Sequence, residues 1–380
     1  MQAEYSEFSS REGDCYVRET SLGALKEVDV VVFDCDGVLL DVRDSYSGAV
    51  AETASIILEA LTGTRIEPSV FDDDVFFAFK KTGQFNGDWT VTYAYVLGAL
   101  STLTDGELSS LAASAGKVGE GSPSERLSEL SRIRSPSGLH AKCLKTKLIE
   151  LAESVGAGGV GGLEVLLIPR IGTEVRDLLR FRDGVGVSVI STLFEEVFGG
   201  AGLFEETFGF PAQFIEEKLG HIEKEKVVLN ASIIPVLEEQ LGGRRLGIAS
   251  GSLRNSAWHA LGGLVELFPR DAQVWHEDVD SAQAGKENLH KPNGYPLLRA
   301  AGFYSPYKRC VYVGDTMADL LTARSAGERD PKFCFVGVYA TATQPMVTKE
   351  MFLSSGVDAV VPTVNHLPLV LDYARRRTRD

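Results

Sequence analysis

The residues best suited to do chemistry in this chain are aspartates that follow short apolar runs. Asp34 comes directly after VDVVVF, and Asp36 follows two residues later. Asp315 comes directly after RCVYVG, and Asp319 follows four residues later. Side chains alternate along an extended chain, so Asp34 and Asp36 face one side and Cys35 the other. Asp319 lies one helical turn beyond Asp315. Four carboxylates brought close together need a cation, and an all-oxygen ligand set favours a hard ion such as Mg²⁺.

Two further polar clusters could bind an anion. Ser250 and Gly251 follow the apolar run LGIA at the expected start of a helix, where a hydroxyl and free backbone amides bind anions. Lys291 precedes a proline and could neutralise a negative charge. Each cluster also has an ordinary interpretation, because Ser-Gly-Ser forms helix caps and turns and a single lysine is usually a solvated surface residue.

The elements that must position these clusters are alternating strands and helices. From residue 243 to the C-terminus, short β-branched runs alternate with helical patterns of 10 to 15 residues, which predicts βαβ units and a parallel sheet. The run before Asp34 is expected to join the same sheet. Ligands of open parallel sheets bind at the carboxyl ends of the strands, and all four clusters follow strand ends or open the next helix.

The long segment between the first two clusters predicts an inserted, mainly helical domain. We expect an α/β core at residues 22–41 and 241–380, with a doubly wound Rossmann-like sheet, and an insertion at residues 42–240. A Gly- and Ser-rich part of the insertion, about 104–162, predicts loops or short helices, and residues 164–181 fit either a strand or a helix. The segment 216–241 predicts a helix with Pro235 as a possible kink.

Together and in this order, the four clusters resemble the motifs of the haloacid dehalogenase (HAD) superfamily of phosphohydrolases. The first motif, DxDGV, matches residues 34–38, and the second matches Ser250 after an apolar strand. The third, in its Lys-Pro form, matches Lys291, and the fourth, GDxxxD, matches residues 314–319. The resemblance covers about residues 28–41 and 243–362. It implies the HAD fold, with the helical insertion similar to a C1-type cap of subfamily I.

The resemblance implies a mechanism at this edge of the sheet. Asp34 would be the nucleophile that forms an aspartyl-phosphate, and Asp36 would act as general acid and base. Asp36 favours phosphoryl transfer over dehalogenation, because a halide leaving group needs no proton. The resemblance also implies which residues bind the metal: Mg²⁺ would be held by Asp34, the Asp36 carbonyl and Asp315, with Asp319 in support. The phosphoryl oxygens would be held by Ser250, Gly251 and Lys291. Arg254 and Asn255 occupy positions that help orient phosphate.

Substrate contacts are expected from residues early in the insertion. Arg43 follows the nucleophile closely in sequence; its ordinary interpretation is a hinge residue paired with Asp41 or Asp44. The other candidates are polar or aromatic residues around two predicted helices: Lys80, Lys81, Asn86, Asp88 and Trp89. Their ordinary interpretations are that Lys80 and Lys81 are cations at a helix end, that Asn86 is a loop residue and that Trp89 is a core residue.

Composition excludes several classes of function. With 53 acidic and 38 basic residues the net charge is −15, which disfavours nucleic acid and anionic membranes as partners. The N-terminus lacks a signal-peptide pattern, and the five cysteines are far apart and never in CxxC, which favours a cytoplasmic protein with reduced thiols. His276 and His290 lack HxH or HExxH spacing and are interpreted as loop residues.

The sequence therefore predicts a Mg²⁺-dependent phosphatase acting on a small phosphorylated metabolite, as a monomer or homodimer. Two alternatives remain open. A phosphomutase would use the same aspartate, and a non-catalytic interaction protein would use the insertion as a binding surface.

Overall fold

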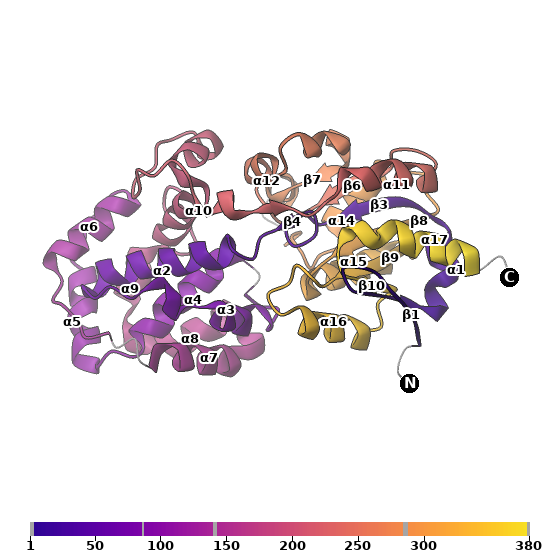
Figure 1. The fold of residues 1–380 in the computed structure, drawn as a ribbon. Coiled ribbons are helices and arrows are strands. Elements are labelled where there is room, and N and C mark those ends of the chain that lie inside the picture. The colour runs from indigo at the N-terminus through magenta and orange to yellow at the C-terminus, as the bar shows by residue number, and fades with distance from the viewer. Residues whose placement is uncertain (1–3, 86, 140–142, 284–287, 378–380) are drawn as a thin grey trace. The chain divides into compact units, whose positions relative to one another are not determined.

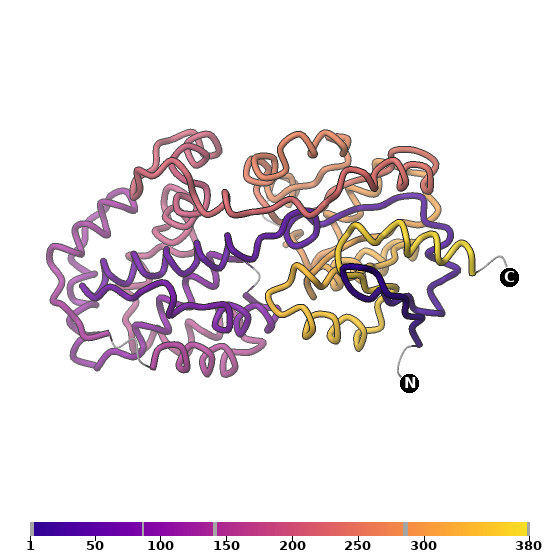
Figure 2. Tube along the Cα trace, viewed as in Figure 1, coloured from indigo at the N-terminus to yellow at the C-terminus, as the bar shows by residue number. Residues whose placement is uncertain are grey.

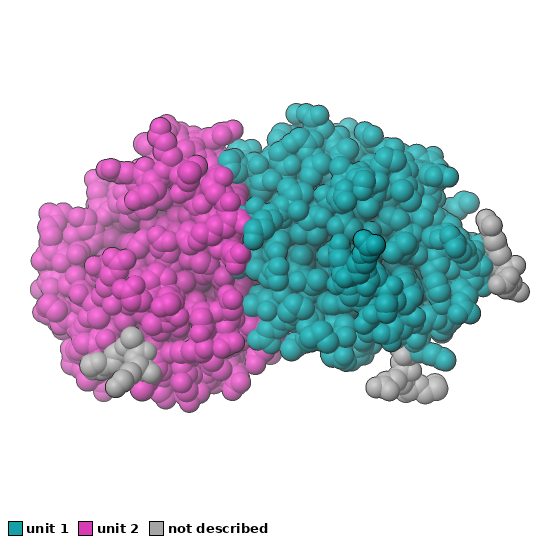
Figure 3. Space-filling model, in the orientation of Figure 1, with its two compact units in different colours: residues 1–43, 225–380 teal, residues 44–224 magenta. Residues whose placement is uncertain are grey.

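The computed structural model describes residues 4–85, 87–139, 143–283 and 288–377. The chain forms two compact units, one made of residues 1–43 and 225–380 and one made of residues 44–224 (Figure 3). The first unit therefore takes in residues before 22, which were predicted to belong to neither domain, and residues 225–240, which were predicted to belong to the insertion. Short strands at 40–41 and 226–227 pair with each other next to the two chain crossings, which explains why the unit boundary lies at 224 instead of 240.

The first unit is built on an eight-stranded sheet in the order β1-β2-β10-β9-β8-β3-β6-β7. Its strands are β1 (Tyr5–Ser9), β2 (Asp14–Arg18), β3 (Val28–Phe33), β6 (Leu246–Ala249), β7 (Gln273–Val274), β8 (Arg309–Gly314), β9 (Phe333–Val338) and β10 (Ala359–Val361). From β10 to β7 the neighbours run parallel. Beside this sheet, β4 (Leu40–Asp41) pairs antiparallel with β5 (Lys226–Val227).

Helices cover both faces of this sheet (Figure 1). They are α1 (Leu22–Lys26), α11 (Ile234–Leu241), α12 (Arg254–Leu261), α13 (His276–Gln283), α14 (Tyr295–Gly302), α15 (Met317–Arg329), α16 (Pro345–Ser354) and α17 (Leu367–Arg377). Val31 and Phe33 of β3 pack with α1, α11, α12 and α17 on one face. Val30 and Val32 pack with α14, α15 and α16 on the other. The expected α/β class with a doubly wound, mostly parallel sheet is confirmed.

The N-terminal hairpin β1-β2 was not predicted. Strand β2 pairs antiparallel with β10 through Val17↔Ala359 and Tyr16↔Val360, so an early segment of the chain lies beside a late one in the first unit (Figure 2, indigo and yellow). YSEFS and DCYVR are short and polar, and the long-range strand partner of this hairpin, β10, lies near the other end of the sequence. Local pattern therefore carries little signal for this edge of the sheet.

The second unit is helical, as expected of the insertion. Its helices are α2 (Tyr46–Thr62), α3 (Asp73–Lys80), α4 (Asp88–Leu100), α5 (Asp105–Ala115), α6 (Pro123–Ile133), α7 (Leu144–Val155), α8 (Gly159–Ile171), α9 (Thr173–Leu179) and α10 (Val189–Phe208). Capping boxes at Thr104 and Ser122 start α5 and α6 inside the Ser-rich segment. The ambiguous segment 164–181 is helical up to Leu179, with Gly172 separating α8 from α9.

The predicted helix over residues 216–241 is wrong for most of its length. Only α11 at its end is helical, preceded by 3₁₀ turns and the short β5. Pro235 lies in the first turn of α11. In that position the missing N–H has no helical partner to lose, so Pro235 begins a helix and does not kink one.

One helical stretch, Leu144–Ile171, is long and apolar enough to cross a membrane by length and composition alone. Gly156 and Gly159 have φ angles of 43° and 54° within it and divide it into α7 and α8. These helices have 12 and 13 residues, whereas a span needs about 20. Leu148 and Leu151 of α7 pack against Gly98 of α4. The stretch is therefore two short helices, of which α7 packs against α4.

Candidate active site

Asp34 lies at the carboxyl end of strand β3, at the carboxyl edge of the sheet. The four residues before it are completely buried, and the Asp34 N–H extends the ladder by donating to the Val313 carbonyl at 2.9 Å. The chain then turns sharply, because the Cys35 carbonyl accepts from the N–H groups of Val38, Leu39 and Leu40. Cys35 itself packs into the core. Side chains alternate here as predicted from the sequence: Cys35 faces the apolar core, and Asp34 and Asp36 face away from it.

Gly37 lets Asp315 approach this turn. Its φ is +73°, in the left-handed region that glycine favours, and a Cβ at this position would overlap the Asp315 carboxylate. The glycine is therefore required both by the turn and by the close approach of the neighbouring strand end.

Three carboxylates meet at this edge. Asp34, Asp315 and Asp319 each offer an oxygen within 4.8 Å of the other two. Lys291 lies among them, with Nζ 2.8 Å from Asp34 Oδ1 and 2.7 Å from Asp319 Oδ1. The structure thus brings together four residues from three predicted clusters that are far apart in the sequence.

Asp319 is fully occupied by donors. Its Oδ2 accepts from the Thr316 hydroxyl at 2.6 Å and the Thr316 N–H at 3.1 Å, which forms the capping box of α15. Its Oδ1 accepts from Lys291 Nζ and, at 2.9 Å, from the Tyr312 hydroxyl. Four donors satisfy the two oxygens, so this geometry favours a positioning role over direct metal ligation. Neither Tyr312 nor Thr316 was singled out from the sequence.

Asp315 differs from Asp319 in that its Oδ1 is shielded from solvent and has no hydrogen-bond partner within the described residues. Burial, with the charges of Asp319 and Asp34, raises the pKa of Asp315 well above its usual range. Burial and the Asp319 charge likewise raise the pKa of Asp34 to about 7, although Lys291 opposes the shift. For Asp319, burial is outweighed by Lys291 and the other donors, so its pKa is lowered.

These observations fit a divalent cation. The one ammonium in this cluster contacts two of its three carboxylates, and the unpartnered buried oxygen of Asp315 needs a positive partner. Oxygen-only donors are those that Mg²⁺ prefers. Asp34 and Asp315 are the side chains placed to hold such an ion, while Asp319 would orient Lys291 beside it.

Asp36 is connected to Ser250 through a residue that the sequence analysis passed over as part of a turn. Ser252 Oγ donates to Asp36 Oδ2 at 2.7 Å and lies 2.9 Å from Ser250 Oγ. Ser250 is held by its N–H, which donates to the Val274 carbonyl of β7 at 3.0 Å. The spacing of two from Ser250 is the signal that could have pointed to Ser252.

No protein-family model matches the sequence, and no curated protein matches it. Among solved structures, a proposed phosphoglycolate phosphatase from Lactobacillus plantarum aligns over 91% of this chain and 98% of its own, with a TM-score of 0.38 and 12% identity. A score this low does not establish a shared fold or activity. The functional assignment therefore rests on the site's own geometry.

Several residues that were predicted to contact phosphate or substrate form ion pairs with other side chains. Arg254 Nη2 pairs with Asp278 at 2.7 Å, and its N–H donates to Glu277 at 3.1 Å. Arg43 makes a bidentate pair with Asp41 at 2.8 and 2.5 Å, which matches the ordinary interpretation. Asn255 is half-buried on α12, and Gly251 is exposed beside Ser250.

The candidates of the insertion are also engaged within their own unit. Lys80 pairs with Asp88 at 2.9 Å, and Lys81 lies 3.8 Å from Glu153. Trp89 Nε1 donates to Glu195 at 2.9 Å. Asn86 lies outside the described residues.

Proposed function

We propose that this chain is a phosphatase of the HAD superfamily, acting on a small phosphorylated metabolite through an aspartyl-phosphate. The observation that carries the proposal is the position of Asp34: a buried carboxylate at the end of a central parallel strand, 2.8 Å from Lys291 and beside Asp315 and Asp319. A lysine that contacts the attacking carboxylate can also neutralise the phosphoryl oxygens that approach it.

In the proposed reaction, an Asp34 oxygen attacks phosphorus, and the bond from phosphorus to the ester oxygen breaks. Asp36 gives its proton to the departing oxygen and later takes a proton from the water that attacks the phosphoaspartate. That second attack releases inorganic phosphate and restores Asp34. The Ser252 hydrogen bond would hold the Asp36 carboxyl in place for both transfers. A bound Mg²⁺ would neutralise charge on the phosphoryl group.

Ser250 and the neighbouring Gly251 amide would hold the phosphoryl oxygens together with Lys291. The Ser250 hydroxyl is buried at the same sheet edge, which supports this role. The unit 44–224 would serve as the cap that selects the leaving group. Arg254 is a weaker candidate for phosphate contact, because its guanidinium already pairs with Asp278.

The test is hydrolysis of p-nitrophenyl phosphate by the full chain with Mg²⁺ or with EDTA. We expect Mg²⁺-dependent turnover that is lost in Asp34→Asn, and a ³²P label that is acid-stable and maps to the Asp34 peptide after quenching. Asp372→Asn, in an exposed ion pair of α17, is the matched control and should keep full activity. Turnover without a divalent cation, or full activity in Asp34→Asn, would refute the proposal. Isomerisation of a sugar phosphate primed by its bisphosphate would favour the mutase instead.

A further inference from the structure

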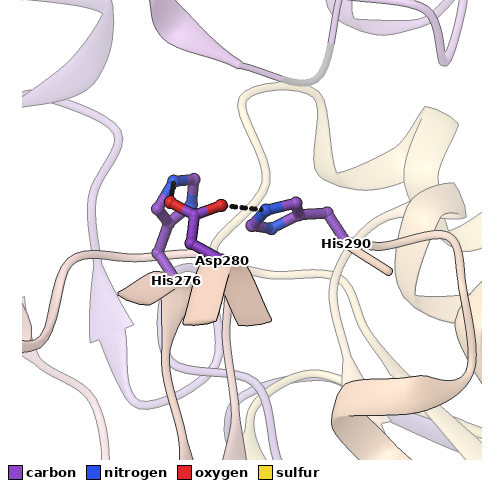
Figure 4. Close-up of side chains that lie close together, drawn as sticks. All are labelled: His276, Asp280 and His290. Atoms are coloured by element: carbon purple, nitrogen blue, oxygen red, sulfur yellow. Dashed lines mark hydrogen bonds and ion pairs between the residues drawn. The ribbon is translucent and has the colours of Figure 1, made fainter. Parts of the chain in front are cut away.

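A second cluster of metal-binding side chains lies in the first unit. His276, Asp280 and His290 each offer one ligand atom within 4.8 Å of the other two. Figure 4 shows the Asp280 carboxylate between the two imidazole rings. Both histidines were expected in loops, but His276 is the first residue of α13. Only Trp275 separates that helix from β7.

We propose that His276, Asp280 and His290 form a binding site for a borderline transition-metal ion of the Zn²⁺ class, chemically distinct from the oxygen-only site at Asp34 and Asp315. Two imidazole nitrogens and one carboxylate oxygen suit Zn²⁺, whereas Mg²⁺ prefers oxygen alone. Three protein ligands leave one position for water, as in exchangeable zinc sites.

The separations of the ligand atoms support this assignment. Donors at about 2.1 Å from a tetrahedral Zn²⁺ lie roughly 3.4 Å from one another. His276 Nε2 lies 3.3 Å from Asp280 Oδ2, which is already close to that spacing. His290 Nε2 lies 2.7 Å from Asp280 Oδ1, a hydrogen bond whose shared proton a metal ion would replace.

The cluster is also held in place by its surroundings. His276 and Asp280 are four residues apart on α13 and so lie on one face of the helix. The backbone N–H of His276 donates to the Ser252 carbonyl at 3.2 Å, which ties the start of α13 to the turn after β6. The rings of His276 and His290 face each other with their centroids 4.6 Å apart.

The other acids of α13 are already committed to different partners. Glu277 accepts from the Arg254 N–H, and Asp278 pairs with the Arg254 guanidinium. Asp280 faces the two histidines instead. With side-chain exposures of 33%, 51% and 24% for His276, Asp280 and His290, an ion can reach the cluster from solvent.

The experiment uses the full chain stripped of metal with EDTA and returned to millimolar Mg²⁺, which keeps the oxygen-only site supplied. Co²⁺ is then added as the probe, and its visible d–d absorption reports nitrogen-containing tetrahedral ligation. We expect absorption that saturates at one equivalent and is displaced by Zn²⁺. His290→Gln and Asp280→Asn should each weaken Co²⁺ binding by at least about 100-fold, more than loss of an outer hydrogen bond does.

Two matched variants separate the sites. His259→Gln removes an exposed histidine of α12 outside the cluster, and Asp34→Asn alters the other site. Both should bind Co²⁺ as the unmodified protein does, whatever happens to phosphatase activity. Absence of the absorption in the unmodified protein, or unchanged affinity in Asp280→Asn, would overturn the proposal and leave a hydrogen-bonded His-Asp-His group only. Because Asp280 is half-exposed, that variant serves even if His290→Gln folds poorly.

Discussion

The Lys291 ammonium lies 2.7 Å from Asp319 Oδ1, in a contact almost sealed from solvent. Since the other oxygen of Asp319 caps helix α15, one carboxylate both starts a helix and fixes the cation of the candidate site. Both the stability of the protein and its activity should therefore depend on Asp319.

Asp319→Asn is expected to lower the free energy of unfolding by roughly 2 to 4 kcal/mol, because it leaves the buried Lys291 with one charged partner fewer. Urea denaturation of the variant and of the unmodified chain measures the loss. Asp372→Asn provides the control, since its exposed ion pair with Arg376 should contribute no more than about 0.5 kcal/mol. Equal stability of the two variants would contradict the role assigned to Asp319.

Asp315→Asn should remove the stabilisation that Mg²⁺ confers. In the unmodified protein, Mg²⁺ is expected to raise the melting temperature by neutralising the carboxylates around Asp315, whose Oδ1 has no partner within the described residues. The variant should show little or no Mg²⁺-dependent rise. Scanning fluorimetry with EDTA and with increasing Mg²⁺ measures this, and a full Mg²⁺ response in Asp315→Asn would argue against metal binding by that residue.

The raised pKa of Asp34 predicts how stability depends on pH without metal. A carboxyl with a folded pKa of about 7 and an unfolded value of 3.8 binds more protons when folded between those values, so its contribution is lost as pH rises through that window. In EDTA, Asp34→Asn should become more stable relative to the unmodified chain by up to roughly 4 kcal/mol between pH 4 and pH 7. Denaturation across that range tests the sign, and a difference that shrinks with rising pH would be inconsistent with it.

Ser252→Ala should impair the proton transfers assigned to Asp36, because Ser252 donates to that carboxyl at 2.7 Å. We expect kcat to fall about tenfold for an alkyl phosphate, whose leaving oxygen needs a proton, and less for p-nitrophenyl phosphate. KM should change little. Ser281→Ala, which removes an exposed hydroxyl from α13, is the control. An equal effect on both substrates would indicate a purely structural role for Ser252.

Gly37→Ala tests the close approach of Asp315 to the turn after β3. The variant meets both the strain of φ +73° and overlap with the Asp315 carboxylate, and should lose about 2 kcal/mol or more of stability together with most activity. Gly83→Ala has a similar φ of +70° but nothing within 4 Å of the new Cβ. Its cost should be limited to about 1 to 2 kcal/mol of backbone strain. If both variants behave alike, steric contact with Asp315 is unimportant.

The polar residues at the strand ends could be anticipated from sequence because each follows a short apolar run. Asp34 and Asp315 come from neighbouring parallel strands, so the sheet itself makes them converge. The contributions of Tyr312 and Ser252 could not be anticipated in this way. A tyrosine inside an apolar strand looks like a core residue, and its hydroxyl reaches Asp319 only because α15 packs on that face.

Contacts between residues far apart in the sequence also could not be predicted from local patterns. The hairpin of β1 and β2 depends on β10, more than 300 residues away. His276 and His290 were set aside because no short spacing connects them, and they meet only through the fold of α13 and the segment that leads to Lys291.

The pairing of β4 with β5 places the departure of the chain from the first unit directly beside its return, through Leu40↔Val227 and Asp41↔Lys226. A segment whose two ends are neighbours can be removed or exchanged without stretching the remaining chain. We therefore expect residues 44–224 to be replaceable as a module. A short turn joining residues 41 and 226 should leave a sheet that can still fold, and helical domains of other sizes could be grafted at the same point.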